Sequence, residues 1–181
     1  MVFLKVAAFT GILAAAFVAA AGAEQVNENN LKAAYVYNLA KFVEWPPQAF
    51  HDAADPISIC VLGESPVYSA LAGAVGGERI DGRKLTVSQY GAIQQMGNCH
   101  LLFIASSESR HLRAILQDPK TSGMLTVGEA AGFLEEGGAV NFRLEDNRVR
   151  MEVNMNAVEQ RKLRISPQLL SLARIVKVSA R

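Results

Sequence analysis

The stretch GMLTVGEAAGFLEEGGAVNFRLEDNRVRMEVN, residues 123–154, decides the fold of this chain. Residues 124–127 are a run of β-forming side chains closed by Gly128, which predicts a short strand that ends at a turn. Residues 129–134 favour a turn or two of helix, and a Gly-Gly pair then opens the next strand. The first half of the stretch therefore predicts a buried strand followed by a glycine corner.

The second half of the stretch predicts a β-hairpin. Apolar and polar residues alternate on both sides of the polar tetrad 145–148. The apolar positions are Val140, Phe142, Leu144, Val149, Met151 and Val153. Alternation of this kind is typical of a half-buried strand, and two such strands joined by an Asp-Asn turn form an antiparallel hairpin. Glu152, beside Asn154, is expected on its solvent-facing side.

The segments around this stretch predict the rest of an α/β domain. Continuous apolar runs predict strands buried on both faces, and segments with helical spacing alternate with them. The expected strands are 57–63, 84–88 and 100–105, and the expected helices are 26–45, 65–71, 108–117, 157–162 and 166–176. Such alternation predicts an α/β fold: a mixed, mainly parallel sheet flanked by helices on both faces, with a C-terminal antiparallel β-hairpin.

The N-terminal residues 1–23 have the composition of a cleaved signal peptide. One cation, Lys5, precedes an apolar run that ends in the small-residue pattern Ala-Gly-Ala. A non-cleaved membrane anchor is the alternative, although a run of about 17 apolar residues only just reaches the length that spans a bilayer. We therefore expect a periplasmic protein, residues 24–181, that forms a single domain without stable membrane insertion.

Charge excludes one class of partner. Removing Lys5 leaves 17 of the 18 basic residues against 17 acidic ones, so the exported chain is neutral with histidine uncharged. A neutral chain without basic clusters lacks the charge that nucleic-acid binding requires.

Cys60 and Cys99 are the only cysteines. In an oxidising compartment an even number of cysteines favours a disulfide. Two buried free thiols are the alternative. A metal site is disfavoured because only His100 adjoins Cys99, with no further ligand at a suitable spacing.

The sequence contains no catalytic or cofactor motif. No dinucleotide or phosphate loop occurs, and His51, His100 and His111 are scattered. Ser106 and Ser107 would suit an anion at a helix N-terminus, but capping explains them more simply. The aromatic residues Tyr35, Tyr37, Phe42 and Trp45 suggest either a ligand cage or, at helical spacing, core packing. We predict no catalytic residues, no metal and no cofactor.

The chain resembles the YfiR-like family of bacterial periplasmic proteins from about residue 30 to residue 176. The resemblance rests on motifs that occur in the family's order: AYVYNLAKFVEWP (34–46), ICVLG (59–63), CHLLFI (99–104), LTV (125–127), Phe133, GGAVNF (137–142) and VRMEVN (149–154). The cysteine pair matches the family's bridge between two buried strands. The family's second disulfide lies in the region of the glycine corner. This chain has Leu134 and Asn141 there but no cysteine, so redox control through that bridge is not expected.

The resemblance implies a non-catalytic repressor. Its expected partner is the periplasmic domain of an inner-membrane diguanylate cyclase, so the protein would restrain cyclic-di-GMP synthesis and biofilm formation; a homodimer is also possible in the family. The hairpin region supplies the expected partner-binding residues: Phe142, Glu152, Asn154 and Val158. The alternative is a periplasmic small-molecule sensor or carrier domain. A hydrolase with a spatially assembled Ser/His/acid cluster is a third hypothesis.

Overall fold

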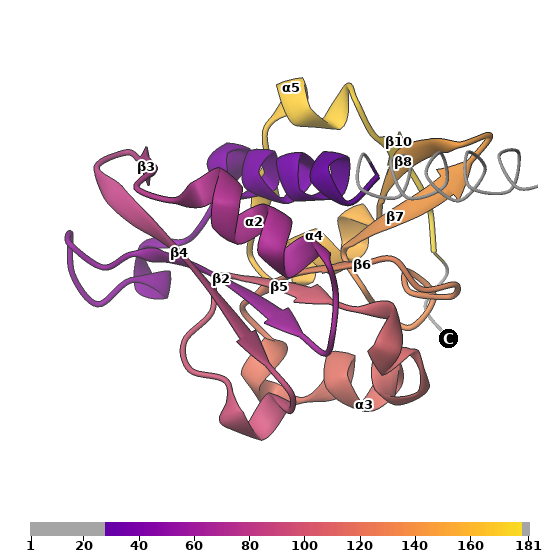
Figure 1. Ribbon diagram of the computed structural model, residues 1–181, viewed down its shortest axis with the longest axis horizontal. Helices are drawn as coiled ribbons and strands as arrows, with labels where there is room; N and C mark the ends of the chain where they lie inside the picture. The colour runs from indigo at the N-terminus through magenta and orange to yellow at the C-terminus, as the bar shows by residue number, and fades with distance from the viewer. Residues whose placement is uncertain (1–27, 179–181) are drawn as a thin grey trace, which may run out of the picture.

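The computed structural model of the protein describes residues 28–178 (Figure 1). The predicted signal peptide lies outside the described residues. Residues 28–42 are helical and form the first helix of the described chain. The strands are β1 (Val43–Glu44), β2 (Ile57–Leu62), β3 (Arg79–Ile80), β4 (Arg83–Tyr90), β5 (Leu101–Ile104), β6 (Leu125–Gly128), β7 (Val140–Glu145), β8 (Arg148–Val153), β9 (Arg164–Ile165) and β10 (Arg174–Ile175). The α-helices are α2 (Val67–Val75), α3 (Leu112–Gln117), α4 (Met155–Gln160) and α5 (Pro167–Leu170), and the 3-10 helices are η1 (Pro47–Ala49), η2 (Ile93–Gln95), η3 (Ser106–His111) and η4 (Pro119–Thr121).

The main sheet confirms the predicted fold class. Its eight strands follow the order β10-β8-β7-β6-β5-β2-β4-β3. The pairs from β4 to β7 are all parallel, and β7 and β8 form the predicted antiparallel hairpin. β1 and β9 form a separate antiparallel pair. The chain thus builds a parallel centre first and then extends it with the hairpin.

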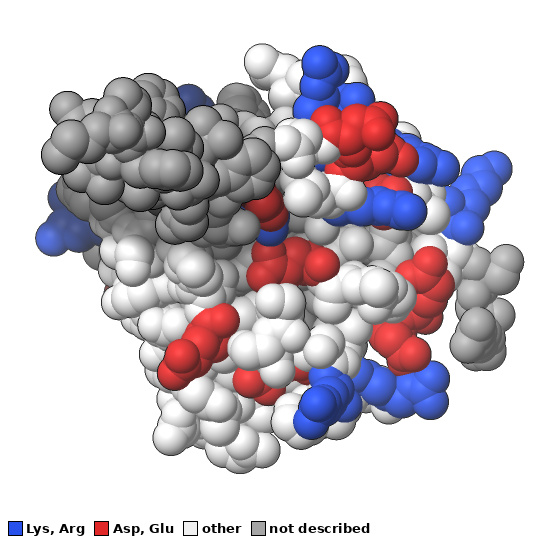
Figure 2. Space-filling model, turned by 45° about the vertical axis from the view of Figure 1, so that its right-hand side comes forward, with Lys and Arg blue, Asp and Glu red and all other residues white. Residues whose placement is uncertain are grey.

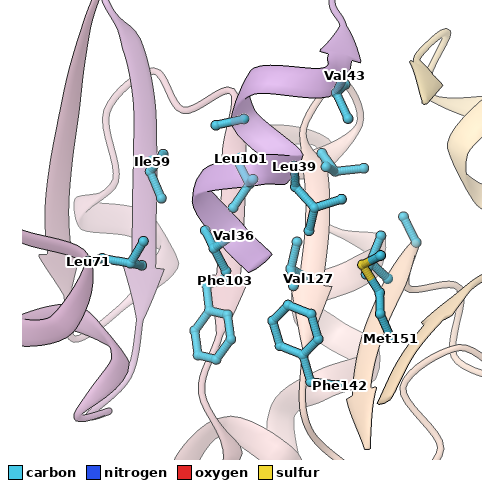
Figure 3. Close-up of a cluster of buried hydrophobic side chains, with 14 of the residues drawn as sticks. Val36, Leu39, Val43, Ile59, Leu71, Leu101, Phe103, Val127, Phe142 and Met151 are labelled. Carbon is cyan, nitrogen blue, oxygen red and sulfur yellow. The ribbon is translucent and has the colours of Figure 1, made fainter. Parts of the chain in front are cut away.

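Helices cover both faces of the sheet, as the continuous apolar strands require (Figure 1). The first helix and α2 pack on one face, where Val36 and Leu71 meet the side chains of Ile59, Phe103 and Phe142 (Figure 3). On the opposite face, α3 packs through Leu112, Ile115 and Leu116 against Cys60, Leu62, Leu102 and Ile104. Alternate side chains of each central strand therefore pack into two separate hydrophobic cores.

The glycine corner is explained by one aromatic ring. Phe133 is fully buried, and its ring lies against both Gly128 and Gly138, where an added Cβ atom at either glycine would overlap it. The backbone N–H of Gly138 also donates to the Phe133 carbonyl at 2.9 Å. The segment 129–137 forms turns without an assigned helix, so the predicted helix at 129–134 is wrong. The ring packs over Gly128 at the end of β6 and over Gly138, two residues before β7.

The predicted helix at 166–176 is also wrong. Only Pro167–Leu170 is α-helical, and Arg174–Ile175 form β10, which pairs in parallel with the outer edge of β8. Leu172, which a helix over 166–176 would place on its apolar face, is 65% exposed. The last segment gains hydrogen bonds by adding to an open strand edge, which one helical turn does not offer.

Candidate functional site

Ligands of doubly wound sheets usually bind where the strand order reverses, beyond the carboxyl ends of the strands. Here that point lies between β2 and β5, because β4 follows β2 on one side and β5 returns to the other. Side chains of η3 already occupy it. A Cβ atom at Gly63 would lie 2.5 Å from Oγ of Ser107 and 2.8 Å from Cγ of Glu108. The position that holds a ligand in related architectures is therefore filled by the protein itself.

The serines at this point are used in backbone contacts. The Ser107 hydroxyl accepts from the Glu64 N–H at 3.1 Å and lies 3.5 Å from the Glu64 carbonyl. His111 lies on the same 3-10 helix but contacts Glu108 at 3.3 Å, and its side chain is 70% exposed. Between residues 28 and 178 no hydrogen bond joins Ser107 to a histidine. This arrangement lacks the nucleophile and base contact that a hydrolase needs.

A buried ion pair lies at the carboxyl end of β6, the strand next to β5. Lys32 of the first helix is 7% exposed and lies 2.7 Å from Glu129, directly after β6, and 2.5 Å from Glu28. Burial lowers the pKa of the Lys32 ammonium, but the two carboxylates raise it more, so its net pKa is above the usual value. Glu129 also accepts from the Ser106 N–H at 3.3 Å. No local spacing pattern indicates this long-range contact.

The carboxyl ends of β2 and β4 leave one open cleft of about 760 Å³. It is lined by residues 63–66 and 89–91. The Gln89 amide donates to the Gly63 carbonyl at 2.9 Å and so spans the two strand ends. Its wall offers few apolar side chains, which is unlike the pockets that hold drug-sized ligands.

The opposite end of the sheet carries an aromatic stack. His100 is buried and lies parallel to the Phe50 ring at 4.5 Å, and the Arg83 guanidinium covers the other side of that ring at 3.8 Å. Trp45 meets His100 edge-on at 6.0 Å. Arg83 is held by the carbonyls of Asp52 and Asp55, both at 2.8 Å from Nη1. Sequence analysis missed this stack because its members are far apart in the chain.

His100 is held in one neutral form. Its Nδ1 accepts from the Ser58 N–H at 3.1 Å, and its Nε2 therefore carries the hydrogen that reaches the Ala49 carbonyl at 3.0 Å. Burial lowers its pKa, and the charge of Arg83 lowers it further, although the Ala49 carbonyl raises it. A second proton on Nδ1 would face the Ser58 N–H, so the charged form is disfavoured.

A cleft of about 430 Å³ opens beside this stack. Its floor includes Val43, Ile57 and Ile80, and the cations Lys41 and Arg83 line it. Trp45 and Phe42 are half-buried and also contribute to the wall. Of the predicted aromatic set, these two therefore reach a cleft, whereas Tyr35 packs on Phe142 at 5.7 Å.

The predicted disulfide is present. Cys60 of β2 and Cys99, directly before β5, are bonded, with their Cα atoms 5.9 Å apart. The two strands are neighbours in the sheet, so the bridge adds a covalent link to an existing hydrogen-bonded pair. In residues 28–178 no group of three or more metal-ligating side chains is brought together.

The four residues predicted to bind a partner are buried. Phe142, Glu152, Asn154 and Val158 are 2%, 8%, 5% and 0% exposed. Phe142 packs between Tyr35 and Phe103, and the Asn154 amide joins the Leu134 carbonyl to the N–H of Ala157 at the start of α4. An apolar patch open to a partner is therefore not formed by these side chains, because the first helix and the corner cover them.

The position of Glu152 corrects the expectation that it faces water. Its carboxylate is flanked by Arg143 at 4.0 Å and Arg174 at 3.8 Å. Arg174 comes from β10, which pairs directly with Glu152 and Val153. The sequence pattern showed the correct face, but it gave no sign that a further strand would add beside it.

Comparison with known proteins identifies a family, and a solved structure shares the fold. The profile of the YfiR/HmsC-like family matches residues 29–174. A conserved domain protein of Vibrio cholerae O1 biovar El Tor superposes with a TM-score of 0.50 at 13% identity, over 66% of this chain and 54% of that chain. The ABC domain from Streptococcus pneumonia, solved in complex with L-Trp, gives a TM-score of 0.49 at 8% identity, over 66% and 55%. This chain thus spans about half of each of these solved chains. Among proteins of curated function, none matches the sequence.

Proposed function

Because the chain belongs to the YfiR/HmsC-like family, we propose that it is a periplasmic regulator that represses an inner-membrane diguanylate cyclase by binding the periplasmic domain of that enzyme. Repression would lower cyclic-di-GMP and restrain biofilm formation. The observation that carries the proposal is the extent of the family match, 146 residues from 29 to 174, which includes almost every element of the described fold.

The contacts that fill the ends of β2, β5 and β6 support a role in binding over catalysis. Ser107 and Glu108 fill the ligand position between β2 and β5, and Lys32 with Glu129 closes the end of β6. A protein that acts by contact uses its outer surface and needs no reactive cleft. A repressor must also bind the active and inactive states of its target with different affinities, since equal affinity would leave the equilibrium between them unchanged.

In this proposal residues 1–23 are removed on export, and the disulfide forms in the periplasm. A bridge of this kind persists in an oxidising compartment and is rare in the cytosol. Within residues 28–178 no helix combines the length and the apolar character needed to cross a membrane. Phe142, Glu152, Asn154 and Val158 would contribute to partner binding from within, by fixing the shape of the hairpin and of α4.

The test is a deletion combined with capture of the partner. Deleting the gene should raise cellular cyclic-di-GMP, and the wild-type chain should restore the original level. Crosslinking in the intact envelope followed by mass spectrometry should recover a membrane protein with a diguanylate cyclase domain. An unchanged cyclic-di-GMP level in the deletion strain would contradict the proposal.

The cleft beside Trp45 favours a second candidate function, a periplasmic small-molecule sensor or carrier. Its apolar floor and two cations suit a small molecule with an apolar body and an anionic group. A thermal-shift screen with aromatic and aliphatic carboxylates should then find a stabilising ligand, and Arg83→Gln should weaken the effect while Arg110→Gln leaves it unchanged. A flat response of the wild-type protein across the panel would rule this candidate out.

A further inference from the structure

Four arginines share one face of the hairpin and its neighbouring strand. The register pairs Arg143 of β7 with Arg150 of β8, and Glu145 with Arg148; β10 places Arg174 beside Glu152. Directly opposite residues lie on the same side of a sheet, and so do residues two apart on one strand. We call the set Arg143, Arg148, Arg150 and Arg174 the arginine face. All four are exposed. In Figure 2, basic side chains surround a group of acidic ones at the upper right of the molecule, and further basic side chains lie along its lower edge.

This face holds an unfavourable pair. Arg143 and Arg150 are direct cross-strand neighbours, and like charges in that position repel each other. The next cross-strand pair on this face, Glu145 and Arg148, has opposite charges, so the hairpin accommodates an acid opposite an arginine. An acid opposite Arg143 would fit in the same way. The repulsion makes this site a natural place for an external anion to bind.

The guanidinium groups of this face have free donors. Glu152 is the carboxylate nearest to Arg143 and Arg174, but the separations of 4.0 and 3.8 Å are too long for hydrogen bonds. In the described part of the chain, no arginine of this face donates a hydrogen bond to a protein atom. Each therefore keeps the forked set of N–H groups that binds a carboxylate in a bidentate manner.

The backbone beside this face is also open. β10 pairs with β8 only at Glu152 and Val153. Among residues 28–178, no strand pairs with the outer edge of β8 at residues 148–151. An extended peptide that adds there would form main-chain hydrogen bonds, and its alternate side chains would lie on the same side as Arg148 and Arg150.

We propose that the arginine face, with the open edge of β8, is the docking surface for an extended acidic segment of a partner protein. The inference rests on the proposed function and names the surface and the chemistry of its partner. An open strand edge adds main-chain hydrogen bonds for a polypeptide, which a lipid headgroup does not form, and this favours a protein segment over an anionic membrane. Carboxylates at every second position of such a segment match the spacing of Arg148 and Arg150.

The test compares two neutralised variants of the exported protein. Arg143→Gln with Arg150→Gln removes two charges from the arginine face, and Lys84→Gln with Arg110→Gln removes two exposed charges elsewhere as the matched control. Binding of a labelled peptide of alternating Glu and Val is measured by fluorescence anisotropy at low and high salt. We expect the face variant to bind about tenfold more weakly than the control, and the difference to shrink as salt screens the charges.

Thermal unfolding separates docking from a structural role. The face variant should melt at or above the wild-type temperature, because the substitution relieves the repulsion between Arg143 and Arg150. Equal peptide binding by the two variants would overturn the inference. So would binding of phosphatidylglycerol vesicles without binding of the peptide, which would assign the face to lipid.

A cellular readout separates this inference from the proposed function. Complementing the deletion strain with the control should restore low cyclic-di-GMP, whereas the face variant should leave it high. Full repression by the face variant would overturn the docking surface and leave the proposed function intact. If the wild-type chain itself does not lower cyclic-di-GMP, the proposed function fails. The peptide-binding measurement alone then tests whether the arginine face is a docking surface.

Discussion

Removing the bridge between Cys60 and Cys99 should lower stability by an amount that can be estimated from its position. The bonded residues are separated by 39 positions. Constraining an unfolded chain over such a loop contributes about 4 kcal/mol in the chain-entropy model, and often less in practice. For a domain of this size, about 4 kcal/mol corresponds to a fall in Tm of roughly 8 to 16 °C.

The measurement compares the oxidised protein, the reduced protein and the Cys60→Ala/Cys99→Ala variant. Reduction removes the constraint without changing side-chain volume, whereas the variant also removes the buried sulfur of Cys60, which is 2% exposed. Both should lose stability in urea denaturation, and the variant should lose about 1 kcal/mol more because it leaves a small void. Alkylation and mass spectrometry of protein taken from the periplasm should find no free thiol.

Two results would refute this reasoning. An unchanged free energy of unfolding after complete reduction would show that the neighbouring strands β2 and β5 already impose the constraint in the unfolded ensemble. Two alkylatable thiols in the periplasmic protein would show that the bond does not form in the cell.

Three further predictions concern single contacts. Gly138→Ala should destabilise the fold by about 1 to 3 kcal/mol, since its Cβ overlaps Phe133, and Phe133→Leu in the same chain should recover part of the loss in a double-mutant cycle. Lys32→Met should cost about 3 kcal/mol in urea denaturation, because it leaves Glu129 buried without its partner, and Glu129→Gln added to it should restore most of that stability. The pKa of His100 is lowered in the folded protein, so the unfolded chain binds a proton first as pH falls below about 6.5. The contribution of His100 to the free energy of unfolding is therefore complete above that pH and is lost below it. His100→Gln should flatten this pH dependence of stability, and a slope unchanged from wild type would contradict the prediction.

The central strands could be predicted because each needs apolar residues on both faces. β2, β5 and β6 read as continuous apolar runs, and the glycine corner followed from Gly128 and the Gly137-Gly138 pair. The hairpin register follows from the alternation together with the two-residue turn at Asp146 and Asn147, so the sequence was sufficient to predict that Arg143 lies opposite Arg150.

The parts that the sequence did not predict depend on contacts between distant segments. Residues 166–176 have leucines at helical spacing, but an open edge on β8 decided that the end of the segment became a strand. Glu152 alternates with apolar residues whether or not another strand covers it, so its burial could not be inferred. The pairing of Lys32 with Glu129 spans 97 positions, and no local pattern reports it.

Charged and polar side chains find partners more completely at the carboxyl ends of the parallel strands than on the hairpin. At the carboxyl ends of the parallel strands, Lys32 has two carboxylates and the Ser107 hydroxyl bonds the backbone of Glu64. On the hairpin, Arg143 faces another arginine, and the Oδ1 atom of Asn141, directly opposite Glu152, is buried without a donor. The repulsion between Arg143 and Arg150 and the unpaired Oδ1 of Asn141 each lower stability. Natural proteins retain such unfavourable groups mainly where function requires them. The unfavourable groups therefore support the proposal that the working surface lies on the hairpin.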